Sequence, residues 1–379
     1  MTILTRKTNN LMRILVTGAN GFIGKNLIVN LNTQESFSVL SYSRENTTDD
    51  LNDLVQQADA IIHLAGENRP KDPAAFDEIN TELTQTLCNA TRKTGRKIPL
   101  VLASSTQAEQ HNPYGISKRA AEEAVEKLAA ECGNPVYIYR LPGVFGKWCK
   151  PNYNSVVATF CHNIANDLPI QIGDESTKLN LLYIDDVVED FMRVIQQSSE
   201  GVVRPEIKPL YTITLGELVS QIKAFKNCRD NLVSEAVGQG VVRALYSTYV
   251  SYLSPEQFSY SLPRHGDERG LFVEMLKTKE SGQFSFFTVH PDVTRGGHYH
   301  NSKTEKFLVL KGSASFRFRH MVTNEIYEMF TNGDESIVVD TVPGWTHNIT
   351  NVGDEDMIVM IWANEIFDHN KPDTIAAEI

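Results

Sequence analysis

Long apolar runs, an excess of basic residues and an export signal are all missing from this sequence. Of its 379 residues 41% are hydrophobic, yet no run approaches the length needed to cross a bilayer. The formal net charge of −11 argues against nucleic acid or an anionic membrane as the main partner. The first residues, MTILTRKTNNL, are polar and contain no apolar signal core, so we expect a cytoplasmic protein.

Cysteine is scarce as well. The chain has five cysteines, an odd number, and no CxxC pair occurs among them. This usage indicates reduced thiols, as in a cytosol. The length predicts two domains, each large enough to bury its own core.

The stretch ILVTGANGFIGKNLI at residues 14–28 combines a short strand, a glycine-rich turn and the start of a helix. Residues 14–16 form an apolar run that is too short for a helix and suits a buried parallel strand. A strand that enters a helix through such a turn leaves backbone N–H groups free, and these groups with the helix dipole suit a diphosphate. The GxxGxxG spacing therefore predicts a dinucleotide site at Gly18, Gly21, Phe22, Ile23 and Gly24.

A second strand is expected at residues 37–43, followed by Arg44 and Glu45. NAD enzymes of this fold hold the adenine ribose with an acidic residue about 20 positions past the glycines. That count ends at Arg44, and an arginine there suits a 2′-phosphate, so the sequence favours NADPH over NADH. The alternative is a solvated surface arginine, and Glu45 keeps that alternative open.

Strands and helices continue to alternate after this point. A third strand at residues 60–66 ends where backbone could approach a cofactor, and we expect His63 inside it to be a packed core residue. A helix over residues 81–93 and a fourth strand over residues 99–104 follow. The alternation predicts a doubly wound α/β fold with a parallel sheet covered on both faces. The cofactor-facing residues expected after the third strand are Leu64, Ala65 and Gly66.

Hydroxyl groups and a YxxxK pair follow the fourth strand. Ser105 and Thr106 stand at its end, and Tyr114 and Lys118 open a helical run that continues through Ala130. Residues four apart share one helix face, so we expect the ammonium to lower the pKa of the phenol from about 10. The phenol would then exchange protons near neutral pH. A lone YxxxK commonly marks an exposed turn, but open α/β sheets bind ligands at the strand ends where this pair lies.

The motifs TGANGFIG, HLAG, SST, YGISK, YRLPGVFG and LLYIDDVV resemble, in kind and order, the extended short-chain dehydrogenase/reductase superfamily. The resemblance implies that Thr106 (or Ser105) hydrogen-bonds the substrate carbonyl oxygen and that Tyr114 protonates it. It also implies that Lys118 holds the nicotinamide ribose. Dehydratases of this branch carry an Asp-Glu pair where this chain has Gln107-Ala108, so a reductase or epimerase is expected.

Beyond residue 263 the pattern changes to short alternating segments, which predict an antiparallel barrel or sandwich. His298 and His300 alternate on one of these strands and should point to the same face. Glu305 and His347 could complete a set suited to Zn²⁺, Mn²⁺, Fe²⁺ or Ni²⁺. The spacing HxH-x4-E-x6-G with PG-x2-H-x3-N resembles the two-part cupin motif. This resemblance implies a cupin barrel with a bound divalent metal, which we expect to be zinc.

A second resemblance leaves the role of His298 open. ERGLFVE at residues 268–274 and RGGHYH at residues 295–300 resemble metal-free cupin epimerases that act on dTDP-4-keto-6-deoxy sugars. In that group the counterpart of His298 is the proton-abstracting base, so His298 is a ligand or a base. His300 in place of a glutamine, together with Glu305, favours metal.

YRLPGVFGKWCKPNYNSVVATFC (residues 139–161) and LYSTYVSYL (residues 245–253) resemble bifunctional enzymes of the CapF type in capsule and O-antigen synthesis. That family implies an NADP-binding reductase domain at 12–245, a cupin domain at 250–379 and a homodimer. It also implies epimerisation at carbon 3 of a UDP-2-acetamido-2,6-dideoxy-4-hexulose, then NADPH-dependent reduction of the 4-ketone. The product would be UDP-N-acetyl-6-deoxy-L-talosamine, on the route to UDP-N-acetyl-L-fucosamine.

Two other readings remain open. One is a redox sensor that binds NADP(H) and metal without turnover, and Tyr114 with Lys118 counts against it because a sensor needs no proton donor. The other is a reductase whose cupin domain is purely structural.

Overall fold

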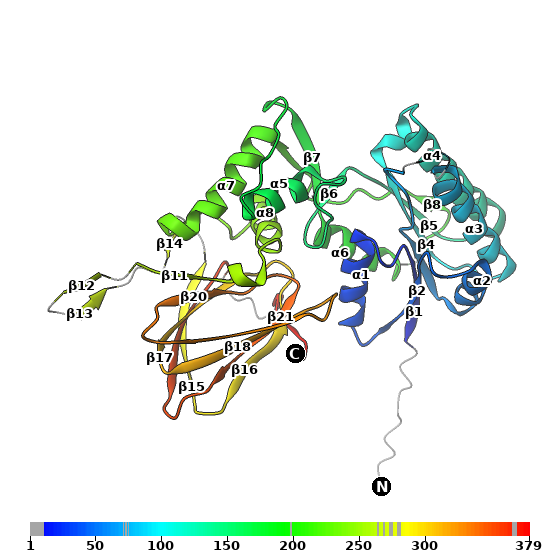
Figure 1. Cartoon of the computed structure of the whole chain (residues 1–379). Helices are drawn as coiled ribbons and strands as arrows, with labels where there is room; N and C mark the ends of the chain where they lie inside the picture. The colour runs from blue at the N-terminus through cyan, green and yellow to red at the C-terminus, as the bar shows by residue number, and fades with distance from the viewer. Residues whose placement is uncertain are drawn as a thin grey trace, which may run out of the picture. The chain divides into compact units, whose positions relative to one another are not determined.

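The computed structural model describes residues 11–70, 72, 74, 76–197, 199–263, 265–267, 270–272, 276–278, 282–365 and 370–379. The chain divides into two compact units (Figure 1). Unit 1 runs to Val144 and includes Asn180–Leu210, whereas unit 2 comprises Phe145–Leu179 and Tyr211–Ile379. The sequence-based division between residues 245 and 250 stays a prediction.

Unit 1 is built on a six-stranded sheet in the order β2-β1-β3-β4-β5-β8, and every pairing in it is parallel. The apolar runs of the sequence form its central strands, whose side chains are almost all buried. This sheet confirms the predicted α/β fold. Its strands are β1 Met12–Thr17, β2 Phe37–Tyr42, β3 Ala60–His63, β4 Leu100–Ser105, β5 Val136–Leu141 and β8 Val202–Val203.

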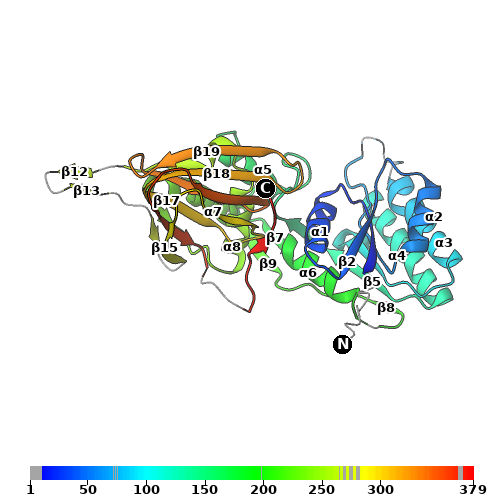
Figure 2. The ribbon, with the colours of Figure 1, turned by 90° about the horizontal axis from the view of Figure 1, so that it is seen from below.

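Helices cover both faces of this sheet (Figure 2). Helices α1 (Phe22–Asn32) and α6 (Ile184–Val194) pack together on one face. On the other face α2 (Thr48–Gln57), α3 (Leu83–Lys93) and α4 (Pro113–Cys132) lie side by side over the apolar core. Both faces of the parallel sheet are therefore shielded from water, as such sheets require.

The helix predicted at residues 81–93 begins earlier in the structure, and its first turn is not α-helical. A π-helical turn, η1 (Asp77–Glu82), leads into α3. Buried Asn80 in this turn accepts a hydrogen bond from the Glu67 backbone N–H (2.7 Å) and donates to the Ser117 hydroxyl (2.9 Å). The partners of Asn80 lie 13 and 37 residues away in the sequence, and these contacts hold the wider turn. No local sequence pattern could therefore predict this turn.

Unit 2 contains two antiparallel five-stranded sheets, in the orders β11-β20-β17-β22-β15 and β19-β18-β21-β16-β23. They confirm the predicted antiparallel barrel or sandwich. The strands are β11 Ser259–Ser261, β15 Gln283–Val289, β16 Thr294–Tyr299, β17 Glu305–Lys311, β18 Ser313–His320, β19 Ile326–Asn332, β20 Ile337–Asp340, β21 Trp345–Asn351, β22 Met357–Ala363 and β23 Ile375–Ala376. The ERGLFVE motif lies mostly outside the described residues, so its resemblance stays a prediction.

Helices α5 (Val156–Ala165), α7 (Leu215–Asn231) and α8 (Gly240–Val250) belong to unit 2. Arg229 near the end of α7 reaches the buried Asp340 carboxylate (2.6 Å) on β20. The Lys306 ammonium on β17 pairs with the same carboxylate (2.6 Å). Residues 246–250 are the buried end of α8.

The remaining described elements are short. They are η2 Thr106–Glu109, β6 Gly143–Phe145, β7 Lys178–Tyr183, β9 Tyr211–Thr214, β10 Val233–Ser234, η3 Pro255–Gln257, β12 His265–Asp267, β13 Gly270–Phe272 and β14 Lys277–Thr278. All five cysteines are free thiols, as predicted. Among the described residues, no helix combines the length and apolar character needed to cross a bilayer.

Candidate functional site

The predicted dinucleotide residues come together at the carboxyl ends of β1 and β3. Gly18 has a φ of +68°, and a Cβ there would lie 2.7 Å from the Ala65 nitrogen, so only glycine fits this turn. A Cβ on Gly24 would lie 2.4 Å from the Gly18 oxygen. Close approach of turn, strand and helix thus requires two of the three motif glycines.

Helix α1 begins at Phe22 with Gly21 as its N-cap residue, and no side chain caps it. Its first turn contains no acidic residue, so the positive end of the helix dipole is not compensated there. Phe22, Ile23 and Gly24 therefore begin a helix whose N-terminus can accept a diphosphate. Leu64 and Ala65 lie against the same turn, since Ala65 donates its backbone N–H to the Thr17 hydroxyl (3.2 Å).

Gly66 connects this turn to the YxxxK helix. A Cβ on Gly66 would lie 3.1 Å from the Asn80 amide oxygen and 3.7 Å from the Lys118 ammonium. His63 is fully buried between the Thr17 and Thr84 hydroxyls, at 2.6 and 2.9 Å, and burial lowers its pKa to about 3. The expectation that His63 is a core residue is confirmed.

Arg44 follows β2 with an 81% exposed side chain, and its guanidinium lies 3.0 Å from the Glu67 carboxylate. The structure thus gives this arginine an ion pair near the third strand and no burial. Its selection of a 2′-phosphate stays a prediction.

Tyr114 stands in the first turn of α4, which Asn112 caps by accepting a hydrogen bond from the Gly115 N–H (2.7 Å). The Ser105 side chain lies close enough to the phenol to lower its pKa, whereas Thr106 is exposed at the start of η2. Of the two hydroxyl candidates the structure therefore brings Ser105, and not Thr106, to the tyrosine.

The expected lowering of the Tyr114 pKa is wrong for this structure. Burial raises the pKa of Tyr114, and the nearby Ser105 side chain acts in the opposite direction. The Lys118 ammonium donates a hydrogen bond to the Ala103 carbonyl (2.6 Å). Burial lowers the pKa of Lys118 itself to about 8, against the attraction of Glu122.

Glu122 is a supporting residue that the sequence reasoning missed. Its buried carboxylate accepts a hydrogen bond from the Ser104 hydroxyl (2.5 Å) and pairs with Arg140 (2.7 Å). It thereby ties the α4 helix to the ends of β4 and β5. Its position four residues after Lys118, on the same helix face, was the available signal.

The four predicted metal ligands form a cluster in unit 2. His298 lies on β16, His300 directly follows that strand, Glu305 begins β17, and His347 lies directly opposite His298 on β21. One ligand atom from each residue lies within 4.8 Å of the others. The same-face expectation for the two alternating histidines is confirmed, since their ring centroids are 5.0 Å apart.

The donor chemistry of this cluster fits a divalent cation. Burial lowers the pKa of His347, and burial with the neighbouring histidines lowers that of His298 to about 3, so both rings are neutral near pH 7. The ring nitrogens of His347 are buried and make no hydrogen bond to any described residue, because the Glu305 oxygen lies 3.6 Å away. Unpaired neutral imidazole nitrogens beside a carboxylate are suitable zinc ligands.

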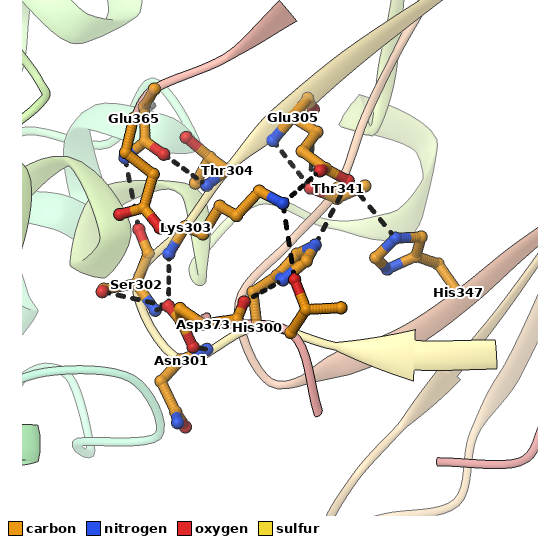
Figure 3. A network of polar contacts seen from close by, with 12 residues as sticks. His300, Asn301, Ser302, Lys303, Thr304, Glu305, Thr341, His347, Glu365 and Asp373 are labelled. Carbon is orange, nitrogen blue, oxygen red and sulfur yellow. Dashed lines mark hydrogen bonds and ion pairs between the residues drawn. The ribbon is translucent and has the colours of Figure 1, made fainter. Parts of the chain in front are cut away.

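Glu305 is held in its ionised form (Figure 3). Burial alone would raise its pKa, but His300 and the Lys303 ammonium together hold that pKa well below its ordinary value. Lys303 lies 2.7 Å from one carboxylate oxygen, and His300 Nε2 lies 3.2 Å from the other. Lys303 is a further residue that the sequence reasoning did not single out.

Comparison with known proteins now identifies the family. Residues 14–207 match the model of the NAD dependent epimerase/dehydratase family, and residues 265–375 match the polysaccharide biosynthesis C-terminal domain. The chain belongs to the NAD dependent epimerase/dehydratase family. Membership of this family implies a nicotinamide cofactor.

One relative covers nearly the whole chain. The UDP-2-acetamido-2,6-beta-L-arabino-hexul-4-ose reductase of Pseudomonas aeruginosa is 55% identical over 368 residues, which are 97% of this chain and 99% of that protein. The crystal structure of the capsular polysaccharide assembling protein CapF from Staphylococcus aureus matches with a TM-score of 0.66 and 42% identity. That match covers 97% of this chain and 100% of CapF.

A more distant structure shares the fold of the family. The UDP-glucuronic acid 4-epimerase of Bacillus cereus, solved with NAD, matches at 21% identity with a TM-score of 0.51. It covers 57% of this chain and 84% of the epimerase.

Proposed function

We propose that the chain is a bifunctional UDP-sugar enzyme that epimerises carbon 3 of a 4-keto sugar and then reduces the ketone with NADPH. The observation that carries the proposal is the 55% identity to a UDP-sugar 4-ketone reductase, which extends over 97% of the chain and so spans both units. The substrate is a UDP-2-acetamido-2,6-dideoxy-4-hexulose, and the product is UDP-N-acetyl-6-deoxy-L-talosamine.

Unit 1 provides the groups that a ketone reduction needs. The cofactor, when bound, supplies the hydride that attacks carbon 4. The Tyr114 hydroxyl gives its proton to the oxygen of that carbon, so the ketone gains a hydride and a proton and becomes an alcohol. Ser105, which lies beside Tyr114, orients the same carbonyl oxygen. Lys118 lies buried beside Gly66, where it can contact the nicotinamide ribose and electrostatically favour the phenolate left after transfer.

The preference for NADPH over NADH is the finer part of the cofactor proposal. It is supported by the exposed guanidinium of Arg44 at the end of β2, where this fold places the adenine ribose. A 2′-phosphate would compete with Glu67 for this guanidinium.

Unit 2 provides the groups for epimerisation. His298, His300, Glu305 and His347 would hold one divalent ion, by preference Zn²⁺, and such an ion supplies a Lewis acid for the oxygen on carbon 4. The proton on carbon 3 is acidic only while carbon 4 is a ketone, so epimerisation must precede reduction. The convergence of all four side chains within 4.8 Å supports His298 as a ligand rather than as the free base.

Proton NMR of the keto-sugar with the enzyme in D₂O tests both activities. Without NADPH, the carbon 3 proton should exchange for deuterium while the ketone persists. With NADPH, the ketone should disappear and the product should carry deuterium at carbon 3. Reduction without any exchange by the wild-type enzyme would leave a reductase with a structural cupin unit. Cofactor binding with neither activity would favour the redox-sensor interpretation.

Two further properties belong to this proposal. A homodimer is expected from the resemblance to the bifunctional enzymes, and light scattering would show a mass twice that of the 42.5 kDa chain. A cytoplasmic location is expected because nucleotide sugars and NADPH are made there.

A further inference from the structure

The last described residues, 370–379, lie against β16, which carries His298 and leads directly into His300. β23 (Ile375–Ala376) pairs with β16, with Ala376 opposite His298 and Ile375 opposite Tyr299. The backbone N–H of Ala377 also donates to the Gly297 carbonyl (2.9 Å). This segment therefore continues the sheet at the edge where the histidines begin.

Asp373, just before β23, makes the most concentrated set of contacts in this segment (Figure 3). Its carboxylate accepts hydrogen bonds from three successive backbone N–H groups, at 2.9, 2.7 and 2.7 Å. The Ser302 hydroxyl adds a fourth, at 3.2 Å. The three N–H donors belong to Asn301, Ser302 and Lys303, which form the turn between the second histidine and the candidate carboxylate ligand.

The backbone of Asp373 acts on the cluster directly. Its carbonyl oxygen lies 2.5 Å from His300 Nδ1. A carbonyl can only accept a hydrogen bond, so Nδ1 must carry a proton, and Nε2 is left as the ring nitrogen that can bind a metal ion. Nε2 is the nitrogen that faces Glu305 at 3.2 Å.

A second layer supports Asp373. Arg243 on α8 lies 3.9 Å from the Asp373 carboxylate and 2.8 Å from Glu365, and it also donates to the Ser302 hydroxyl. Only 14% of the Asp373 side chain is exposed. The residue is thus fixed from several elements of unit 2 rather than lying on a free tail.

We propose that Asp373 is a positioning residue for the metal centre, which fixes the His300 tautomer through its carbonyl and the 301–303 turn through its carboxylate. This inference rests on the metal site of the proposed function. Residues that orient ligating histidines in this way typically change metal affinity by 10- to 100-fold when they are replaced.

The test compares full-length Asp373→Ala with Glu378→Ala, which removes an exposed carboxylate from the same segment. Zinc affinity is measured by competition with a chromogenic chelator. Asp373→Ala should bind Zn²⁺ about 10- to 100-fold more weakly, and Glu378→Ala within about twofold of wild type. Equal affinity of Asp373→Ala and wild type would overturn the proposal. If Asp373→Ala fails to fold, Asp373→Asn, which keeps one acceptor oxygen, decides by the same criterion.

A metal-free measurement separates this inference from the proposed metal site. ¹⁵N–¹H NMR of histidine-labelled apoprotein should show a protonated, hydrogen-bonded His300 Nδ1 in wild type and Glu378→Ala. Asp373→Ala keeps the backbone carbonyl but loses the carboxylate that anchors the segment, so this Nδ1 hydrogen bond should be lost or weakened. If wild type bound no zinc, the metal centre would fail, yet an unchanged His300 Nδ1 signal in Asp373→Ala would still refute the positioning role.

Discussion

In unit 1 the groups expected to bind the cofactor are mostly backbone amides at strand ends, whereas in unit 2 the candidate metal ligands are four side chains, three of them buried and His298 partly buried. The unit 1 groups follow one another along short stretches of chain, at residues 17–24, 63–66 and 105–118. The unit 2 cluster also depends on Asp373, which lies 73 residues from the histidine it contacts. One site is thus specified by local turns and the other by tertiary contacts.

The two sites also differ in electrostatics. The N-terminus of α1 offers an uncompensated positive dipole end to an anion. In the unit 2 cluster, the Glu305 carboxylate already has two partners in Lys303 and His300. The first arrangement is suited to a ligand that dissociates after each turnover, and the second to an ion held permanently. The predictions below test this contrast, starting from the largest expected effect.

Replacing Tyr114 by Phe should lower ketone reduction by at least about 10²- to 10⁴-fold, because the proton donor is lost. Carbon 3 exchange without NADPH should stay at the wild-type rate, since that chemistry resides in unit 2. Tyr137→Phe, which removes a phenol hydroxyl bonded to the Gln197 carbonyl in the same unit, is the control. Loss of both activities in a folded Tyr114→Phe protein would refute the division of labour.

Replacing His347 by Ala tests whether the metal is catalytic. If it is, carbon 3 exchange measured without NADPH should fall about 10²- to 10³-fold, the usual cost of one lost oxyanion contact. If the ion only joins strands, exchange should persist while the melting temperature drops. His290→Ala, at a histidine whose side chain is 77% exposed, should change neither exchange nor zinc content.

The hydroxyl assignment can be decided with a matched pair. Ser105→Ala should lower kcat for reduction about 10- to 100-fold, because the hydrogen bond to the carbonyl oxygen is lost. Thr106→Ala should stay within about twofold of wild type because that side chain is exposed. The reverse ranking would return the role to Thr106.

Arg44→Ala should reduce the preference for NADPH over NADH by about tenfold. A hydrogen bond to a charged group contributes about 1.5–3 kcal/mol, and exposure of this side chain places the effect at the lower end. Titration of both cofactors measures the ratio, with Arg92→Ala as an exposed control paired to Glu131. If wild type bound NADH as tightly as NADPH, the assignment of NADPH as the cofactor would be wrong.

The smallest predicted effect concerns stability rather than activity. His63 is neutral in the folded state because burial lowers its pKa to about 3. Below about pH 6.5 the unfolded chain binds a proton that the folded protein excludes, so stability falls as the pH drops through that value. Between pH 7.5 and 5.5 this accounts for about 1 kcal/mol in the free energy of unfolding.

Urea titrations of metal-free wild type and His63→Asn measure this pH term. The variant should lose about 1 kcal/mol less than wild type between the two pH values. His290→Asn should behave as wild type. An unchanged pH slope in His63→Asn would show that His63 is not excluded from protonation by folding.

The sequence predicted what short motifs determine. The glycine turn, the strand ends and the HxH pair all take the expected places, because the spacing of glycines and the two-residue period of a strand act locally. The raised Tyr114 pKa was missed, since it follows from the burial of the phenol in the folded chain. The choice between Ser105 and Thr106, which the sequence left open, stays a prediction. Asn80 and Asp373 were missed because each acts on residues far along the chain.

The Asp340 carboxylate, paired with Arg229 of α7 and Lys306 of β17, limits how this protein can be divided and recombined. A fragment that began at residue 250 would leave Arg229 behind, and breaking a buried pair of this kind costs about 3–5 kcal/mol. The matched family segments end at residue 207 and resume at residue 265, so helices α7 and α8 belong to neither of them. Chimeras that exchange the sugar-epimerising module between enzymes should therefore carry both helices with the sheets.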